Sequence, residues 1–156
     1  MISVDIPGHP HIRLDHLVLD YNGTLAVDGV LEPGVADALN RLAGELTVHV
    51  VTADTFGKAK TGLDGVECRL SILPPGAHDA AKLDYVHRLG AGSTAAIGNG
   101  RNDRLMLRAA ALGIAVILRE GAARETMAAA DIVCTGILPA LELLLSPLRL
   151  TATLRA

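Results

Sequence analysis

The sequence predicts a doubly wound α/β fold, in which helices cover both faces of a mostly parallel sheet to give three layers (α/β/α). Short apolar segments of β-like character alternate with segments of helical periodicity along the chain, as in βαβ units. The segments 114–118 and 132–134 are continuously apolar, as expected of parallel strands that are buried on both faces. The 156 residues suffice for one domain, and no linker or repeat divides residues 1–156.

Six β-like segments account for the predicted sheet. The first precedes a glycine-containing turn, and the second (TVHVVT) is apolar enough to be buried. The third stops at Pro74 and Pro75, because proline cannot donate to a ladder of strand hydrogen bonds. In chain order, the predicted strands cover residues 12–20, 47–52, 66–73, 94–97, 114–118 and 132–134.

Helices are predicted between these strands. The first begins near Pro33, since proline is favoured in the first turn of a helix. Apolar residues follow it at helical spacing: Val35, Leu39, Leu42 and Leu46. The later helices are predicted at 55–63 with Asp54 or Thr55 as the cap, at 79–89, from 102 or 103 to 112, at 122–130, and around Ile137, Leu141 and Leu144.

The C-terminal tail, residues 148–156, has a different pattern. Leucine and alanine alternate there with arginine and threonine (LRLTATLRA), which is the period of a half-buried strand. We expect an edge strand on the chain's own sheet or, as the alternative, a strand exchanged with a second subunit.

Composition and charge exclude several classes of function. Fourteen basic and 17 acidic side chains give a net charge of −3, which argues against a nucleic-acid binder that neutralises phosphates. The apolar runs are too short to span a membrane and the first residues do not form a secretory signal, so we expect a cytoplasmic protein without a membrane partner. Cys68 and Cys134 lack metal-ligand spacing and are expected to be reduced thiols.

Polar clusters recur at the strand ends, where parallel sheets bind ligands. Their order is a carboxylate, a hydroxyl, a lysine near a helix start and a glycine-rich acidic loop. A single polar turn would be ordinary, whereas four clusters in this order form a specific constellation. They are Asp20-Tyr-Asn-Gly-Thr24, Thr52-Ala-Asp54, Lys82 and Gly98-Asn-Gly-Arg-Asn-Asp103.

Through these clusters the sequence resembles the haloacid dehalogenase superfamily of phosphohydrolases and phosphotransferases. The stretches VLDYNGTLAVDG, HVVTADTFG and AIGNGRNDRLML carry the likeness, which is strongest to soluble relatives of the phosphorylation domain of P-type ATPases. The resemblance implies a Rossmann-like sheet over nearly the whole chain. Each interval between the first three clusters has room for one helix and parts of strands, so we expect no cap domain.

The resemblance implies a Mg²⁺-dependent phosphatase that acts on a small phosphorylated substrate through an aspartyl-phosphate on Asp20. The implied catalytic residues are Asp20, Asn22, Thr52 and Lys82. The implied phosphate-binding residues are Gly23 and Thr24 through their backbone N–H groups, together with Thr52, Ala53, Lys82 and Asn102. The implied magnesium site comprises Asp20, the backbone carbonyl of Asn22, Asn99 and, behind them, Asp103.

Two positions depart from the family pattern. Asn22 stands where most members have an aspartate that acts as general acid and base, and an amide cannot perform proton transfer that is typically worth about 10²–10⁴-fold in rate. Asn99 stands where an acidic metal ligand is usual, which should weaken magnesium binding without abolishing it. We therefore expect slow turnover.

These departures leave other functions open. One alternative is a non-catalytic phosphate-binding module, and another is a phosphoacceptor switch that a partner protein reads. The likeness to P-type ATPases also suggests ATP hydrolysis, although no nucleotide-binding domain is visible in the sequence. Capless relatives tend either to oligomerise or to act on large substrates. We expect a homo-oligomer, because the Ala/Leu-rich composition and the alternating tail both offer contact surface.

Overall fold

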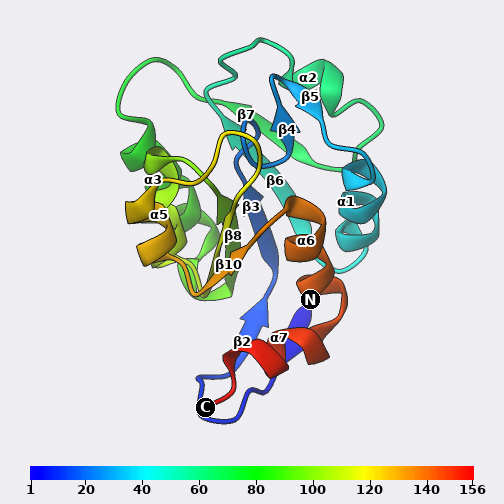
Figure 1. The fold of residues 1–156 in the computed structure, drawn as a ribbon, viewed down its shortest axis with the longest axis vertical. Coiled ribbons are helices and arrows are strands. Elements are labelled where there is room, and N and C mark those ends of the chain that lie inside the picture. Colours follow the sequence, from blue (N-terminus) through cyan, green and yellow to red (C-terminus); the bar gives the residue numbers. More distant parts are fainter.

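Six parallel strands form the central sheet, in the order β10-β9-β8-β3-β6-β7 (Figure 1). This arrangement comes from a computed structural model that describes residues 1–156. The strands are β3 (His16–Leu19), β6 (Thr47–Thr52), β7 (Arg69–Ile72), β8 (Thr94–Gly98), β9 (Leu112–Val116) and β10 (Ile132–Cys134). The predicted doubly wound α/β fold is confirmed, and β3, which carries the first polar cluster, lies inside the sheet between β6 and β8.

Helices cover both faces of the sheet, as Figure 1 shows. One face packs against α1 (Val35–Ala43) and α6 (Ile137–Leu145), and the other against α3 (His78–Leu89), α4 (Arg104–Ala109) and α5 (Arg124–Ala129). The two apolar clusters follow from the alternation of side chains along each strand. On β3, Leu17 and Leu19 belong to the larger cluster, whereas Val18 belongs to the smaller one beneath α3 and α4.

The predicted first strand, 12–20, is two strands with different partners. Residues Ile12–Leu14 form β2, which pairs antiparallel with β1 (Ile2–Val4), and only the following residues enter the main sheet as β3. The break falls at Asp15, whose N–H donates to the backbone oxygen of Ser93 (2.8 Å). The N-terminal residues thus form a small hairpin below the sheet.

The predicted edge strand or exchanged strand in 148–156 is wrong. Residues Pro147–Leu154 form helix α7, which begins at proline, a residue favoured in the first helical turn. Leu150 and Leu154, four residues apart, face the core, while Leu148 is 86% exposed. Helical spacing therefore prevails over the alternation, and the backbone N–H of Ala156 bonds to Pro7 O (3.0 Å) of the same chain.

A short hairpin, β4 (Ala26–Val27) and β5 (Val30–Leu31), follows β3. Its turn residues Asp28 and Gly29 both have positive φ (52° and 79°), the backbone of a type I′ turn, for which Asp-Gly is a favoured sequence. This hairpin is the only insertion of regular structure between β3 and α1, in agreement with the expected absence of a cap domain.

The remaining boundaries shift without changing the topology. The helix predicted at 55–63 shrinks to α2 (Ala59–Gly62), and Oδ1 of Asp54 accepts hydrogen bonds from the N–H groups of Lys58 and Ala59 (both 3.0 Å). The helix predicted from 102 or 103 to 112 is divided into a 3₁₀ turn, η2 (Arg101–Asp103), and α4; a second such turn, η1 (Ala91–Ser93), precedes β8.

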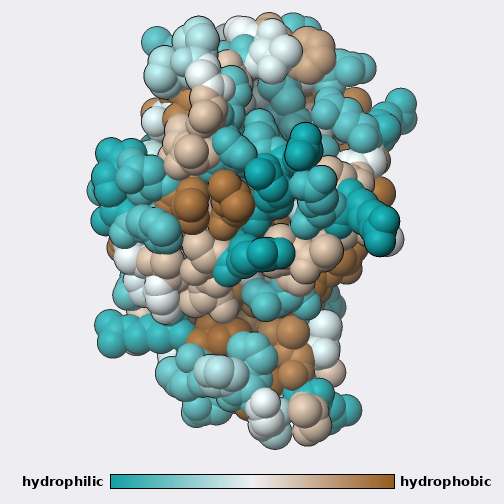
Figure 2. Space-filling model, turned by 90° about the vertical axis from the view of Figure 1, so that its left-hand side faces the viewer, coloured by the Kyte–Doolittle hydropathy of each residue, from teal (hydrophilic) through white to brown (hydrophobic).

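The surface carries no broad apolar face on the side of α3 and α5. Figure 2 shows mostly hydrophilic residues there, with smaller brown areas between them. No single helix meets the length and hydropathy required of a membrane span; the α6–α7 pair, bent by 104°, meets them only when the two are joined. The expected homo-oligomer stays a prediction.

Candidate active site

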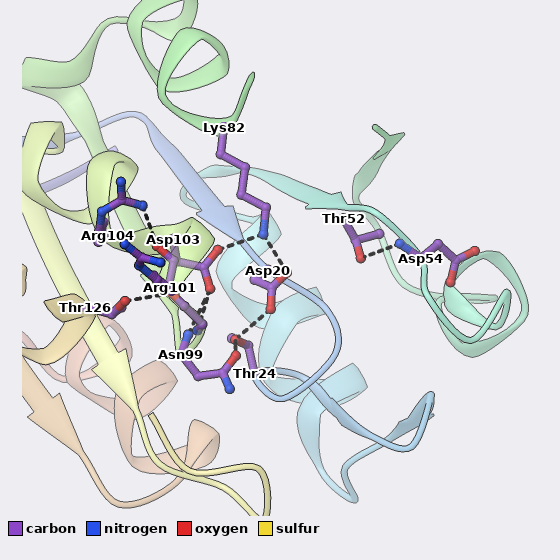
Figure 3. Close-up of polar contacts among 11 residues, drawn as sticks. Asp20, Thr24, Thr52, Asp54, Lys82, Asn99, Arg101, Asp103, Arg104 and Thr126 are labelled. Carbon is purple, nitrogen blue, oxygen red and sulfur yellow. Dashed lines mark hydrogen bonds and ion pairs between the residues drawn. The ribbon is translucent and has the colours of Figure 1, made fainter. Parts of the chain in front are cut away.

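The polar clusters meet at the carboxyl edge of the sheet. Asp20 directly follows β3, Lys82 reaches the edge from α3, and Asn99 and Asp103 follow β8. Figure 3 shows these side chains converging, with Lys82 extending between the two aspartates. All four are buried: Lys82 and Asp103 are 0% exposed, and Asp20 and Asn99 are 7% and 6% exposed.

Lys82 bridges the two carboxylates. Its Nζ donates to Oδ1 of Asp20 and to Oδ1 of Asp103, each at 2.7 Å. Burial disfavours the charged ammonium, but the charges of Asp20 and Asp103 and their hydrogen bonds outweigh that effect and raise the pKa of Lys82 above its usual value. The lysine is therefore a fixed positive charge beside Asp20.

Asp103 is held from two sides. Its Oδ2 accepts the backbone N–H groups of Asn99 (3.0 Å) and Gly100 (2.9 Å), while Oδ1 faces Lys82. Burial and the neighbouring charge of Asp20 raise the pKa of Asp103 to about 6, against the opposing effects of Lys82 and the Gly100 hydrogen bond. A Cβ atom at Gly98 would lie 2.5 Å from Cγ of Asp103, so glycine is required for this close approach.

Oxygen atoms outnumber the donors on the opposite side of Asp20. The hydroxyl of Thr24 lies 3.2 Å from both Oδ2 of Asp20 and Oδ1 of Asn99, yet it carries only one proton. In the same loop as Thr24, Oδ1 of Asn22 is also buried and has no hydrogen-bond partner. Oxygen acceptors that share too few protons fit a hard cation such as Mg²⁺, which prefers oxygen ligands.

The site offers few acidic ligands for a metal ion. The chain contains no group of three His, Cys, Asp or Glu side chains close enough to bind a metal ion together. Here the amide oxygen of Asn99 shares the Thr24 hydroxyl with Asp20, so any divalent ion would depend on neutral ligands and on water as well as on carboxylates.

Other predicted site residues lie apart from the cluster. Thr52 is buried at the end of β6, where its Oγ1 accepts the N–H of Asp54 (3.0 Å), and Figure 3 shows this pair set away from Asp20. Ala53 follows it and is partly exposed, and the Asn102 side chain makes no hydrogen bond within the chain. The N–H groups of Gly23 and Thr24, predicted to bind phosphate, bond to Ala26 O (2.7 Å) and Tyr21 O (3.2 Å).

Two neighbours of the site were not singled out from the sequence. The buried Tyr21 donates its hydroxyl proton to Gly29 O (3.0 Å) and so joins the β4–β5 hairpin to the loop that carries Asp20. Thr126 of α5 donates to Gly100 O (2.6 Å) and anchors the loop after β8. The Asp-Gly pair between two valines signals the hairpin, whereas nothing in the sequence marks Thr126.

Known proteins share this fold. The chain superposes on 3-deoxy-D-manno-octulosonate 8-phosphate phosphatase of Moraxella catarrhalis, solved with magnesium and phosphate ions, with a TM-score of 0.70 and 18% identity over 85% of this chain and 86% of that one. A haloacid dehalogenase-like hydrolase of Streptococcus pneumoniae gives a TM-score of 0.61 and 13% identity over 83% and 97% of the two chains. These likenesses show the fold of the chain, which it shares with a solved haloacid dehalogenase-like hydrolase and a solved phosphatase.

The chain also superposes on a phospho-aspartyl intermediate analogue of phosphoserine phosphatase, with a TM-score of 0.67 and 14% identity over 83% of this chain and 98% of that one. At the sequence level, no family profile matches the chain. An uncharacterised protein of Methanocaldococcus jannaschii is 55% identical over 60 residues, which are 38% of this chain. The chain spans 64% of that relative's length.

Proposed function

We propose that this protein is a phosphohydrolase that transfers the phosphoryl group of a small phosphomonoester to Asp20 and then to water. The observation that carries the proposal is the buried pair of Asp20 and Lys82, 2.7 Å apart at the carboxyl edge of the sheet. A carboxylate in this position is a competent nucleophile, and the adjacent ammonium offsets charge on the phosphoryl oxygens. The phosphatases that share the fold support the same reaction class.

The reaction proceeds in two displacements. A carboxylate oxygen of Asp20 forms a bond to phosphorus while the ester P–O bond breaks, and the leaving oxygen takes the bonding pair and a proton from water. Water then attacks the aspartyl-phosphate, which releases inorganic phosphate and restores the carboxylate. Lys82 holds Asp20 in place and stabilises negative charge through both steps.

A divalent cation would be held by Asp20, the backbone carbonyl of Asn22 and the side chain of Asn99, with Asp103 behind them. Magnesium bound there would neutralise negative charge on the phosphoryl group that is transferred. The single hydroxyl proton of Thr24, shared between the oxygens of Asp20 and Asn99, supports this placement. Thr52, Ala53 and Asn102 border the same edge and are proposed to contact the phosphate once substrate is bound.

Turnover is expected to be slow because Asn22 carries no exchangeable acidic proton. The leaving group and the attacking water both lose the assistance of a general acid and base, worth about 10²–10⁴-fold. The same substitution favours a longer-lived aspartyl-phosphate, so a phosphoacceptor with little hydrolysis is the second candidate.

One incubation separates the candidates. The protein is mixed with Mg²⁺ and an aryl phosphate, acetyl phosphate or ATP, and phosphate release and intact protein mass are followed together. Steady release that Asp20→Ala abolishes supports the phosphohydrolase, and the preferred donor identifies the substrate class. A stable phosphorylated protein without release supports the phosphoacceptor. The absence of both contradicts any phosphoryl transfer and leaves a binding module.

A further inference from the structure

A tight turn after β9 places an unpredicted carboxylate beside the site. The turn runs from Leu118 to Gly121, where the N–H of Gly121 donates to Leu118 O (3.0 Å) and Gly121 has a φ of 71°. Glu120 lies in this turn and is exposed. Its carboxylate forms neither an ion pair nor a hydrogen bond within the chain, so it is an unneutralised anion.

Asn99 fixes the position of this turn. Its Nδ2 donates to Gly121 O (3.0 Å), and its backbone oxygen accepts the N–H of Ala123 (2.8 Å). The amide thus contacts the turn through nitrogen while its Oδ1 points to Thr24. An aspartate at position 99 could not donate to Gly121, so the amide that lowers the charge of the site also holds Glu120 near it.

Gly23 shows how close the carboxylate comes. A Cβ atom at this residue would lie 2.6 Å from Oε2 of Glu120, 2.5 Å from Nδ2 of Asn99 and 2.8 Å from its Oδ1. The Glu120 carboxylate and the Asn99 amide therefore lie next to one another over the backbone of Gly23, whose φ of 82° also favours glycine. Both side chains lie against the loop that joins Asp20 to Thr24.

The net charge of the buried cluster suggests a role for the Glu120 carboxylate. Asp20 and Asp103 carry two negative charges and Lys82 returns one positive charge, so the buried cluster alone has a net charge of −1. A divalent cation would leave an excess positive charge there. The exposed carboxylate of Glu120 would bring the net charge to zero without entering the buried cluster.

We propose that Glu120 supplies the acidic group that the metal site lacks at position 99, acting on the cation through its water ligands. The inference rests on the proposed function for the identity of the cation. Mg²⁺ and Mn²⁺ retain several waters, and a carboxylate that accepts hydrogen bonds from them strengthens binding although it does not contact the metal.

Manganese binding tests this role directly, because the fraction of free Mn²⁺ is measured by electron paramagnetic resonance without any substrate. Glu120→Gln should weaken Mn²⁺ binding by about 10-fold. Glu67→Gln is the matched control, since Glu67 is exposed and its carboxylate has no ion pair. Adding Asn99→Asp to the Glu120→Gln variant should restore most of the lost affinity, because the carboxylate returns to the neighbouring position.

The outcomes separate this inference from the proposed function. If wild type binds Mn²⁺ and releases phosphate while Glu120→Gln binds as tightly as wild type, the role of Glu120 is rejected and the phosphohydrolase stands. If wild type neither binds Mn²⁺ nor releases phosphate, both are rejected. A third result is that Glu120→Gln and the double variant lose the same Mn²⁺ affinity while their thermal unfolding is unchanged. That result would show that a carboxylate at position 99 does not replace Glu120, and it would overturn the proposed role.

Discussion

The ammonium nitrogen of Lys82 lies 2.7 Å from Oδ1 of Asp20, and the lysine side chain is completely buried. A single buried ion pair seldom repays the cost of removing two charges from water. Here Asp103 accepts a second hydrogen bond from the same nitrogen and is itself held by two backbone N–H groups. The three side chains therefore form one unit, in which each charge depends on the other two.

Replacing Lys82 should destabilise the protein. Lys82→Met leaves two neighbouring buried carboxylates without a counter-charge, and we expect a loss of about 3–5 kcal/mol in the free energy of unfolding. Urea denaturation in metal-free buffer measures it. Lys60→Met, at an exposed lysine of α2, should change the free energy of unfolding by less than about 0.5 kcal/mol. A similar small effect at Lys82 would show that the buried charges are not interdependent.

Asn22→Asp should accelerate phosphate release. The substitution places a titratable carboxyl where Oδ1 of the amide is buried without a partner, and it supplies the acid and base that the site lacks. We expect an increase of about 10²-fold or more in kcat with an aryl phosphate. Single-turnover measurements should show faster decay of the aspartyl-phosphate. An unchanged rate of decay would mean that proton transfer does not limit this step.

Gly98→Ala should disturb the site through Asp103, against which Gly98 packs. The added methyl group would lie 2.5 Å from Cγ of Asp103 and displace that carboxylate from Lys82. We expect a loss of about 1–3 kcal/mol in the free energy of unfolding, together with reduced phosphate release. Gly92→Ala is the control, since a Cβ atom there meets nothing within 4 Å. Equal effects of the two substitutions would contradict the packing argument.

His49 should make stability depend on pH. Its imidazole is 1% exposed and bonds to Tyr85 Oη (2.9 Å) and to His16 (3.3 Å). Burial, with the nearby charges of His16 and Arg69, lowers the pKa of His49 from 6.5 to about 4. As the pH falls through 6.5 the unfolded chain binds a proton that the folded chain refuses until about pH 4, so stability declines across this range.

The loss attributable to His49 is at most about 3–4 kcal/mol. Urea unfolding at a series of pH values, compared between wild type and His49→Gln, measures it. The variant should lose less stability on acidification than wild type does. Identical pH profiles for the two proteins would show that His49 is not the titrating group.

Much of the fold follows from the sequence because burial on both faces leaves a strong apolar signal. The strands at 47–52, 94–97 and 132–134 are recovered with boundaries that differ by at most one residue. The errors lie where local patterns are ambiguous. The tail alternates like a strand, yet it forms a helix in which Leu150 is buried and Leu154, four residues later, packs partly buried against the same core.

The sequence predicts the part of the candidate site that is built from residues near the strand ends. Asp20, Lys82, Asn99 and Asp103 meet because parallel strands point their carboxyl ends to one edge. Glu120 could not be found in this way, since its position depends on a turn held by the amide of Asn99. The hydrogen bonds that the N–H groups of Gly23 and Thr24 make to Ala26 and Tyr21 could not be predicted either, because they depend on the turn before β4.

Locating the phosphoryl group tests the central claim most directly. The protein is incubated with Mg²⁺ and acetyl phosphate, quenched in acid, and digested for peptide mass spectrometry. We predict that the added phosphoryl group lies on Asp20, that hydroxylamine removes it as it does any acyl phosphate, and that Asp20→Ala acquires none. Phosphate release by Asp20→Ala at the wild-type rate, with no modification at position 20 in wild type, would contradict the account.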